Sequence, residues 1–145
     1  MTAGTAYAES VVRELPDEPV GAGEPVTVRL TQEGFFCNVS TVSEILPDGF
    51  EYMSGSYTGT YPPTYYADNN TLVMWLAGED EITETYTVTT GNVTQIRNAM
   101  FVGTYWGFVG GLDDKVNGSV TGDENLTVAA TYAESVVREI PDEPV

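Results

Sequence analysis

The residues that could do chemistry in this chain are mostly carboxylates. Its 145 residues include 22 acidic side chains, five basic ones, one cysteine and no histidine. Without histidine, neither a Ser-His-Asp or Cys-His pair nor the usual zinc ligand sets can form. Two carboxylates could hydrolyse a glycosidic bond, but among so many acids some pair always lies within about 5–10 Å, so that signal is unspecific. The composition therefore predicts a protein that is not an enzyme.

An acidic cluster late in the chain is a weak candidate for a calcium site. Asp113, Asp114, Asn117 and Asp123 lie close together in sequence, and calcium prefers several oxygen ligands on flexible loops. The stretch DDKVNGSVTGDE lacks the alternating ligand spacing of an EF-hand. A solvated acidic surface is therefore the stronger interpretation, and no cofactor other than calcium is expected.

Asparagine is concentrated in glycosylation sequons. Five of the seven asparagines precede x-Ser or x-Thr, whereas the Ser and Thr content predicts about one such triplet by chance. The pattern favours an exported glycoprotein. Turns are expected at Asn92 and Asn117, where a glycan would fit, and a strand is expected at Asn38. The candidate acceptors are Asn38, Asn69, Asn92, Asn117 and Asn125.

A tyrosine-rich loop at 54–68 is the best candidate for a binding surface. Its aromatic residues, Tyr57, Tyr61, Tyr65 and Tyr66, accompany two consecutive prolines. Such rings give a large contact area at low entropic cost, which suits sugar rings or a neighbouring subunit. The alternative is that the rings cover the open edge of a β-sandwich.

Other reactive or aromatic residues have plainer interpretations. Cys37 is expected to be a small buried hydrophobe. The only lysine, Lys115, could in principle form an amide crosslink with asparagine beside a buried acid, but its acidic loop favours a solvated side chain. The core is expected to hold Trp75, Tyr105 and Trp106.

The charge excludes several classes of partner. A net charge of −17 opposes binding to nucleic acid, which needs a basic surface, and to an anionic membrane. No apolar run reaches the ~18 residues needed to insert directly into a membrane. An acidic surface suits solubility in high salt, cation binding or a like-charged cell exterior.

A duplicated stretch organises the chain. Residues 6–20 read AYAESVVRELPDEPV and residues 131–145 read TYAESVVREIPDEPV, at a constant offset of 125. Near-identity at a fixed distance indicates a tandem array. We therefore expect one module at 6–130, followed by the opening strand of the next module or a strand donated to a neighbour. Its strand-pairing residues are Tyr132, Val136, Val137 and Ile140.

The rest of the chain reads as short strands between turns. Apolar residues alternate with period two, and turn signals recur at about 8–12 residues, which is typical of an antiparallel immunoglobulin-like β-sandwich. In the opening strand, Val11, Arg13 and Leu15 share one face. A turn is expected at 46–50 and a hairpin turn at Gly91-Asn92. The expected strands are 7–15, 26–30, 35–45, 50–53, 72–76, 82–89, 93–106, 116–120 and 125–128.

The order of these motifs resembles a known family. TVRL at 27–30, ILPDGFEY at 45–52, NTLVMWLAGE at 70–79 and VNGSVTGDENLTV at 116–128 are similar to the Ig-like repeats of archaeal cell-surface and sheath proteins, especially those of methanogens. In that family an LPxGF or LPxGY turn precedes a tyrosine-containing strand. The resemblance implies a secreted, often glycosylated wall, sheath or stalk component. It supplies no catalytic residues.

These patterns favour a structural role. We expect an extracellular module of a repetitive cell-surface, sheath or filament protein, whose partners are copies of itself, joined through β-strands and interface aromatics. The alternative function is a carbohydrate-binding or adhesion module that uses the tyrosine-rich loop to hold glycans.

Overall fold

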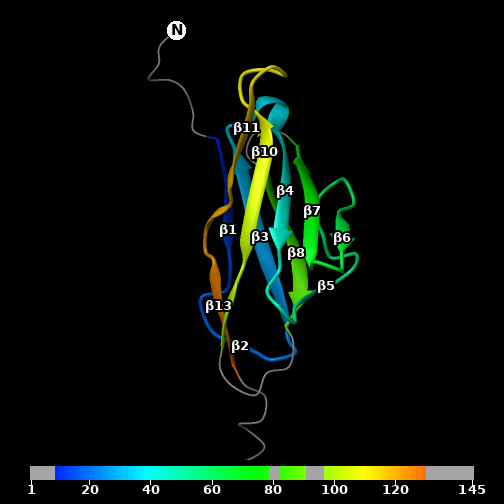
Figure 1. Ribbon diagram of the computed structural model, residues 1–145, viewed down its shortest axis with the longest axis vertical. Coiled ribbons are helices and arrows are strands. Elements are labelled where there is room, and N and C mark those ends of the chain that lie inside the picture. Colours follow the sequence, from blue (N-terminus) through cyan, green and yellow to red (C-terminus); the bar gives the residue numbers. More distant parts are fainter. Residues whose placement is uncertain (1–8, 79–81, 91–96, 130–145) are drawn as a thin grey trace, which may run out of the picture.

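The computed structural model describes residues 9–78, 82–90 and 97–129, and these form β-strands with one short 3-10 turn. Two five-stranded sheets make up most of the elongated molecule (Figure 1). The first sheet has the order β12 (Thr121–Gly122), β1 (Ser10–Glu14), β3 (Pro25–Glu33), β8 (Ile82–Thr89), β5 (Glu51–Tyr52). The second has the order β11 (Lys115–Ser119), β10 (Val102–Phe108), β4 (Val39–Ile45), β7 (Thr71–Ala77), β6 (Thr64–Tyr66).

A third, three-stranded sheet lies at the lower end of the molecule in Figure 1. Its order is β2 (Val20–Gly21), β13 (Asn125–Ala129), β9 (Arg97–Met100). Only Phe101 separates β9 from β10, and two residues separate β12 from β13. These chain segments therefore pass from one sheet to another almost without a break.

Most strand pairs are antiparallel, and the edges carry two exceptions. β1 pairs in parallel with β12, where Val12 lies opposite Thr121, and β2 pairs in parallel with β13. The longest ladder joins β3 to β8, from Pro25 opposite Thr89 to Gln32 opposite Ile82. The predicted immunoglobulin-like β-sandwich is confirmed, with these two short parallel pairings added.

The core lies between the two large sheets. Period-two alternation places Val26, Val28 and Leu30 of β3 inside, and Met74 and Leu76 of β7 opposite them. The predicted shared face of the opening strand is confirmed, because Val11, Arg13 and Leu15 are all buried. The predicted turn at 46–50 also forms, with the Phe50 amide donating to the Pro47 carbonyl.

The predicted strand at 35–45 is wrong in its first part. A 3-10 turn occupies Phe36–Asn38, and Cys37 and Asn38 have φ angles of 59° and 55°. Buried Gln32 holds this turn, since its amide donates to the Asn38 carbonyl at 2.7 Å and its carbonyl accepts from the Ser40 hydroxyl. The turn carries Cys37 to the surface, so its predicted burial is also wrong.

The predicted burial of both tryptophans is wrong as well. Trp75 is 55% exposed and Trp106 is 41% exposed. Their strand neighbours Met74, Leu76 and Tyr105 take the inward positions, and successive residues of a strand face opposite sides. The indoles therefore stand on the outer face of the second sheet, and only Tyr105 is buried as predicted.

Candidate functional site

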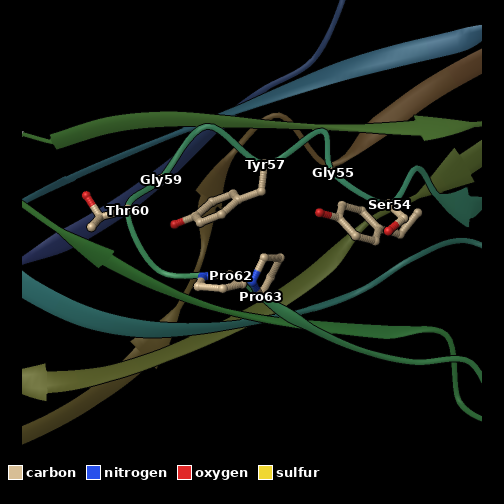
Figure 2. Close-up of a pocket in the computed structure, with 8 residues that line it drawn as sticks. Ser54, Gly55, Tyr57, Gly59, Thr60, Pro62 and Pro63 are labelled. Atoms are coloured by element: carbon tan, nitrogen blue, oxygen red, sulfur yellow. The ribbon is translucent and has the colours of Figure 1, made fainter.

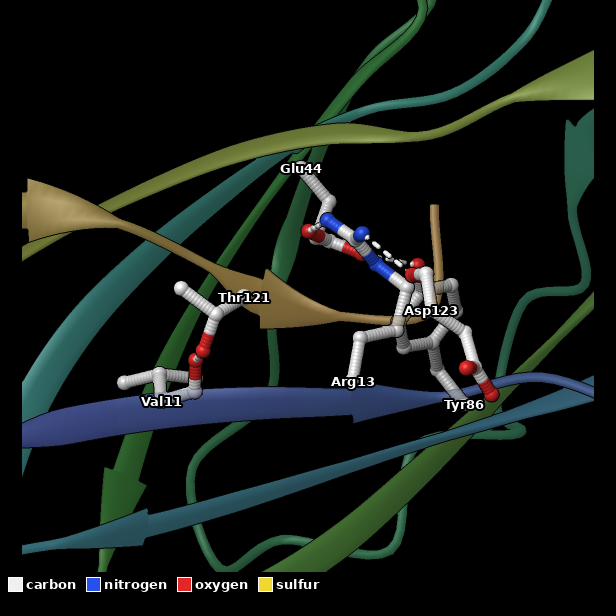
Figure 3. A network of polar contacts seen from close by, with 6 residues as sticks. All are labelled: Val11, Arg13, Glu44, Tyr86, Thr121 and Asp123. Carbon is white, nitrogen blue, oxygen red and sulfur yellow. Dashed lines mark hydrogen bonds and ion pairs between the residues drawn. The ribbon is translucent and has the colours of Figure 1, made fainter. Parts of the chain in front are cut away.

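The place occupied by β1 is the most specific polar site in the described part of the chain. Arg13 reaches from β1 across the core to Glu44 of β4, and both side chains are fully buried (Figure 3). Its Nε donates to Glu44 Oε1 at 2.9 Å and its Nη2 donates to Oε2. The Tyr86 hydroxyl donates to Oε1 of the same carboxylate at 2.6 Å. One ion pair thus ties the first sheet to the second.

The Arg13–Glu44 pair keeps Arg13 charged although it is buried. Burial alone would lower the pKa of Arg13, but hydrogen bonding to Glu44 and the negative charge of Glu44 outweigh it and raise that pKa. The pKa of Tyr86 is raised well above its ordinary value, first by burial and then by the nearby Glu44 carboxylate. Such a pair is stable only when both partners are present.

Asp123, in the short link between β12 and β13, also binds β1 through hydrogen bonds. Arg13 Nη1 donates to the Asp123 carbonyl at 2.8 Å, and the Asp123 amide donates to the Arg13 carbonyl at 2.9 Å. The Asp123 carboxylate accepts from the Leu15 amide at 3.0 Å. At the other end of the strand, the Tyr105 hydroxyl donates to Glu9 at 2.9 Å. We call this position, bounded by β3, β12, Asp123 and Glu44, the β1 slot.

Every side chain that the β1 slot holds has a counterpart in the second copy of the stretch. The offset of 125 matches Glu9 to Glu134, Val11 to Val136, Arg13 to Arg138 and Leu15 to Ile140. The strand itself is identical, since SVVRE occurs at both 10–14 and 135–139. The predicted strand-pairing residues Tyr132, Val136, Val137 and Ile140 lie outside the described residues.

The tyrosine-rich loop closes the open edge of the sandwich. Its first part runs along β8, where the Thr58 amide donates to the Thr85 carbonyl at 2.9 Å. Its last part forms β6, which pairs with β7. The loop therefore joins the edge of the first sheet to the edge of the second, as the edge-covering interpretation expects.

Two of the four loop tyrosines hold the loop in place. The Tyr57 hydroxyl bonds to the Trp75 carbonyl and to Glu84, and the Tyr65 hydroxyl donates to Asn70 Oδ1 at 2.5 Å. Burial raises the pKa of Tyr57, and the Glu84 contact adds to this. Burial also raises the pKa of Glu84, against the opposing hydrogen bond from Tyr57.

The other two loop tyrosines are exposed. Tyr61 is 47% exposed and packs its ring edge-on against Trp75, with 5.9 Å between centroids, and Tyr66 is 52% exposed. A hollow of about 420 Å³ lies within the loop, where Tyr57 faces Pro62 and Pro63 (Figure 2). The loop thus offers a small concave surface and one exposed aromatic pair.

The candidate calcium ligands are not brought together. Asp113 and Asp114 lie in the turn between β10 and β11, whereas the Asp123 carboxylate is bound to the Leu15 amide. Within the described ranges, no three His, Cys, Asp or Glu side chains are placed to hold a metal ion. Asn117 belongs to β11 rather than to a turn.

The sequons differ in accessibility. Asn69, Asn117 and Asn125 are exposed, and Asn38 is half-buried. Asn38 does not lie in a strand as expected but in the 3-10 turn. Asn92, together with its predicted hairpin turn, lies outside the described residues.

Lys115 is exposed, with its Nζ 4.7 Å from the Trp106 ring centroid. It lies on the opposite face of the second sheet from buried Glu44.

Reading the sequence alone missed the Arg13–Glu44 pair. The signal for it was present, because Arg13 shares a face with Val11 and Leu15, and an arginine on a buried face requires a buried acid. Nothing in the sequence selected Glu44 from the other acids. That choice depends on the register that places β4 opposite β1 across the core.

Comparison with known proteins shows the fold only. No family model and no curated protein matches the sequence. Domains D2 and D3 of the major pilin SpaD from Corynebacterium diphtheriae superpose with a TM-score of 0.60 at 11% identity, over 81% of this chain and 51% of that chain. The sixth cohesin of scaffoldin B from Acetivibrio cellulolyticus, solved in complex with a Cel5 dockerin mutant, gives 0.54 at 10% identity, over 86% and 100%.

A collagen adhesin from S. aureus is similar with a TM-score of 0.50 at 13% identity, over 87% of this chain and 50% of that chain. This chain therefore spans about half the length of the pilin and adhesin chains that it matches. The resemblance to archaeal repeats stays a prediction. Among the described residues, none of the helical segments is long and apolar enough to cross a membrane.

Proposed function

We propose that this chain is a non-enzymatic structural module of an extracellular, repetitive surface or filament protein, and that residues 131–145 supply the β1 strand of the next module. One observation carries the proposal. The β1 slot is built around Arg13, Val11 and Leu15, and the second copy repeats this set with only leucine changed to isoleucine. The second copy therefore carries the side chains that the slot binds, with isoleucine in place of leucine.

The distances within the module support a place for the second copy in another module's slot rather than in its own. Thr121 lies beside Val12, and Ala129 lies beside Gly21. The chain between Thr121 and Ala129 runs in the direction of β1 and covers about 20–25 Å at extended rise, allowing for the bend at Gly122. To enter the slot of its own module, Ser135 would have to take the place of Ser10, which precedes Val12 by two residues. It would therefore have to return over that distance and about 7 Å more. Six residues span at most about 21 Å.

The same geometry supports a linear assembly. β1 lies in the upper half of the sandwich and β13 ends at its lower end (Figure 1). Only the five residues 130–134 separate β13 from the second SVVRE strand, so Ser135 lies six residues from Ala129 and can reach about 21 Å at most. Modules joined in this way follow one another end to end. The acidic charge and the exposed sequons at Asn69 and Asn125 suit a cell exterior.

The test is site-directed crosslinking in the whole chain. With Cys37→Ser as background, Thr31→Cys is combined with Val137→Cys, because Thr31 lies opposite Val12 in the β3–β1 ladder and Val137 is the counterpart of Val12. After unfolding and refolding at high concentration, we expect disulfide-linked dimers and longer ladders on a non-reducing gel. Arg13→Ala should increase the ladders by weakening the resident strand.

Two controls define the outcome. Thr31→Cys with Val12→Cys should give an intramolecular crosslink, which verifies the register of the resident β1. Arg138→Ala should abolish the ladders, since a strand without arginine leaves the buried Glu44 unpaired. Monomers alone in the Thr31→Cys/Val137→Cys chain, with the Val12 control crosslinked, would contradict the proposal.

The alternative of carbohydrate binding by the tyrosine-rich loop has weaker support. The hollow at Tyr57, Pro62 and Pro63 is its best evidence. The hydroxyls of Tyr57 and Tyr65, however, are engaged within the framework. A sugar would therefore meet mainly Tyr61 and Tyr66.

A further inference from the structure

The outer face of the second sheet is free of acidic residues in a strongly acidic chain. Outward positions of β4 carry Val39, Thr41, Ser43 and Ile45. Those of β10 are Val102, Thr104, Trp106 and Phe108. Outward positions of β6, β7 and β11 also lack carboxylates, and Lys115 is the one charged residue on the outer face of these five strands. By contrast, the outer face of the first sheet carries Glu14, Arg29, Glu33 and Glu51.

The same face gathers the exposed hydrophobic side chains. Trp106 and Trp75 lie on either side of Thr41 in one cross-strand row. Each has an aromatic neighbour at 5.9 Å between centroids, Phe108 for Trp106 and Tyr61 for Trp75. A groove of about 340 Å³ runs between the indoles, bordered also by Phe36 and by Leu112, which is 74% exposed. Exposed apolar patches of this kind mark interaction sites.

Charge identifies the partner that such a face fits. Two copies with a net charge of −17 repel one another wherever acidic surfaces approach. A face without carboxylates is where copies can approach without placing like charges opposite each other. Depletion of acids, together with aromatic enrichment, is the composition of the buried centre of protein interfaces. Large aliphatic side chains such as Ile45, Val102 and Leu112 also suit a protein partner better than a sugar.

We propose that this face, centred on Trp75, Thr41 and Trp106, is the contact between two copies of this chain, packed face to face. The contact is lateral, because it uses the side of the sandwich, whereas the β1 slot joins modules along the molecule's length. It does not depend on strand exchange. Together the two contacts would turn linear arrays into paired or bundled ones.

Intrinsic fluorescence tests this contact directly, since Trp75 and Trp106 are the only tryptophans in the chain. The whole chain with Arg138→Ala, which suppresses strand exchange, is followed by sedimentation equilibrium and by acrylamide quenching over a range of concentrations. We expect dimers to form with a parallel loss of quenching. Association should strengthen from about 0.1 to 1 M salt, because the screening length falls from about 10 to about 3 Å.

Matched variants decide the result. Trp75→Glu places a carboxylate on the face at an exposed position and should weaken association at least about tenfold, as expected for a central interface residue. Thr27→Glu adds the same charge on the outer face of the first sheet, where Thr27 is exposed. This variant should change the association constant less than about twofold. A monomer at all concentrations and salts, or dimers whose tryptophans stay fully quenchable, would overturn the proposal.

Discussion

At the residue scale, the buried Arg13–Glu44 pair joins the two large sheets across the core. Taking two charges out of water is costly, and their attraction repays the cost only when further hydrogen bonds complete the network. Here Tyr86 and the Asp123 carbonyl supply those bonds. Gly103 makes room for the pair, because a Cβ at that position would overlap the Glu44 carboxylate and approach the Arg13 guanidinium.

Arg13→Met should therefore cost about 3–5 kcal/mol of unfolding free energy, because it leaves the Glu44 carboxylate buried without its cation. The double variant Arg13→Met/Glu44→Leu should cost less than Arg13→Met alone, since no unpaired charge remains. Urea unfolding of the unsubstituted chain, Arg13→Met, Glu44→Leu and the double variant completes the double-mutant cycle. Strictly additive losses would show that the two side chains do not act as a pair.

Three tyrosines make the fold sensitive to alkali. The pKa of Tyr105 is raised to about 12, first by burial and then by its bond to Glu9, and the pKa values of Tyr57 and Tyr86 are raised as well. Unfolded tyrosine has a pKa of about 10. Above about pH 10 the unfolded chain therefore binds fewer protons than the folded one, and stability falls as pH rises.

We expect the melting temperature to be level from pH 8 to 9.5 and to fall steadily between about pH 10 and 12. Tyr105→Phe should make this fall shallower, at a cost of about 0.5–1.5 kcal/mol at neutral pH for the lost hydrogen bond to Glu9. Thermal unfolding followed by circular dichroism measures both chains. An unchanged melting temperature at pH 12 would show that these phenols are not held protonated by the fold.

At the element scale, alternation predicted the strands well where one face is buried. The strand expected at 82–89 forms at Ile82–Thr89, and that expected at 72–76 forms within Thr71–Ala77. The strand prediction fails where a contact with a residue outside the segment overrides the local sequence pattern. Gln32 stabilises a turn at Phe36–Asn38 that the β-rich sequence gave no sign of.

The candidate site was only partly predictable for the same reason. Duplication of SVVRE was visible in the sequence, but its meaning depends on a parallel pairing with β12 and an ion pair across the core. The face of Trp75 and Trp106 was misjudged because hydrophobicity says how much a residue gains from burial and not which side of a strand it occupies. Only the register of β4, β7 and β10 places both indoles outside.

At the scale of the whole molecule, charge sets the conditions under which the module is most stable. Twenty-two acids against five bases repel one another across a domain of this size, and this self-repulsion opposes the compact state. Salt screens exposed charges and leaves buried pairs such as Arg13–Glu44 almost unaffected. Stability should therefore rise with salt without any specific ion.

The melting temperature of Trp75→Glu, chosen so that face-to-face dimerisation adds no stability, should rise by several degrees between about 0.02 and 1 M NaCl. CaCl2 and MgCl2 at equal concentration should give the same melting temperature as each other, because Asp123 is bound to Leu15 and the described residues gather no metal-binding group. A larger rise with calcium than with magnesium at submillimolar concentration would instead assign a specific calcium site to this acidic surface.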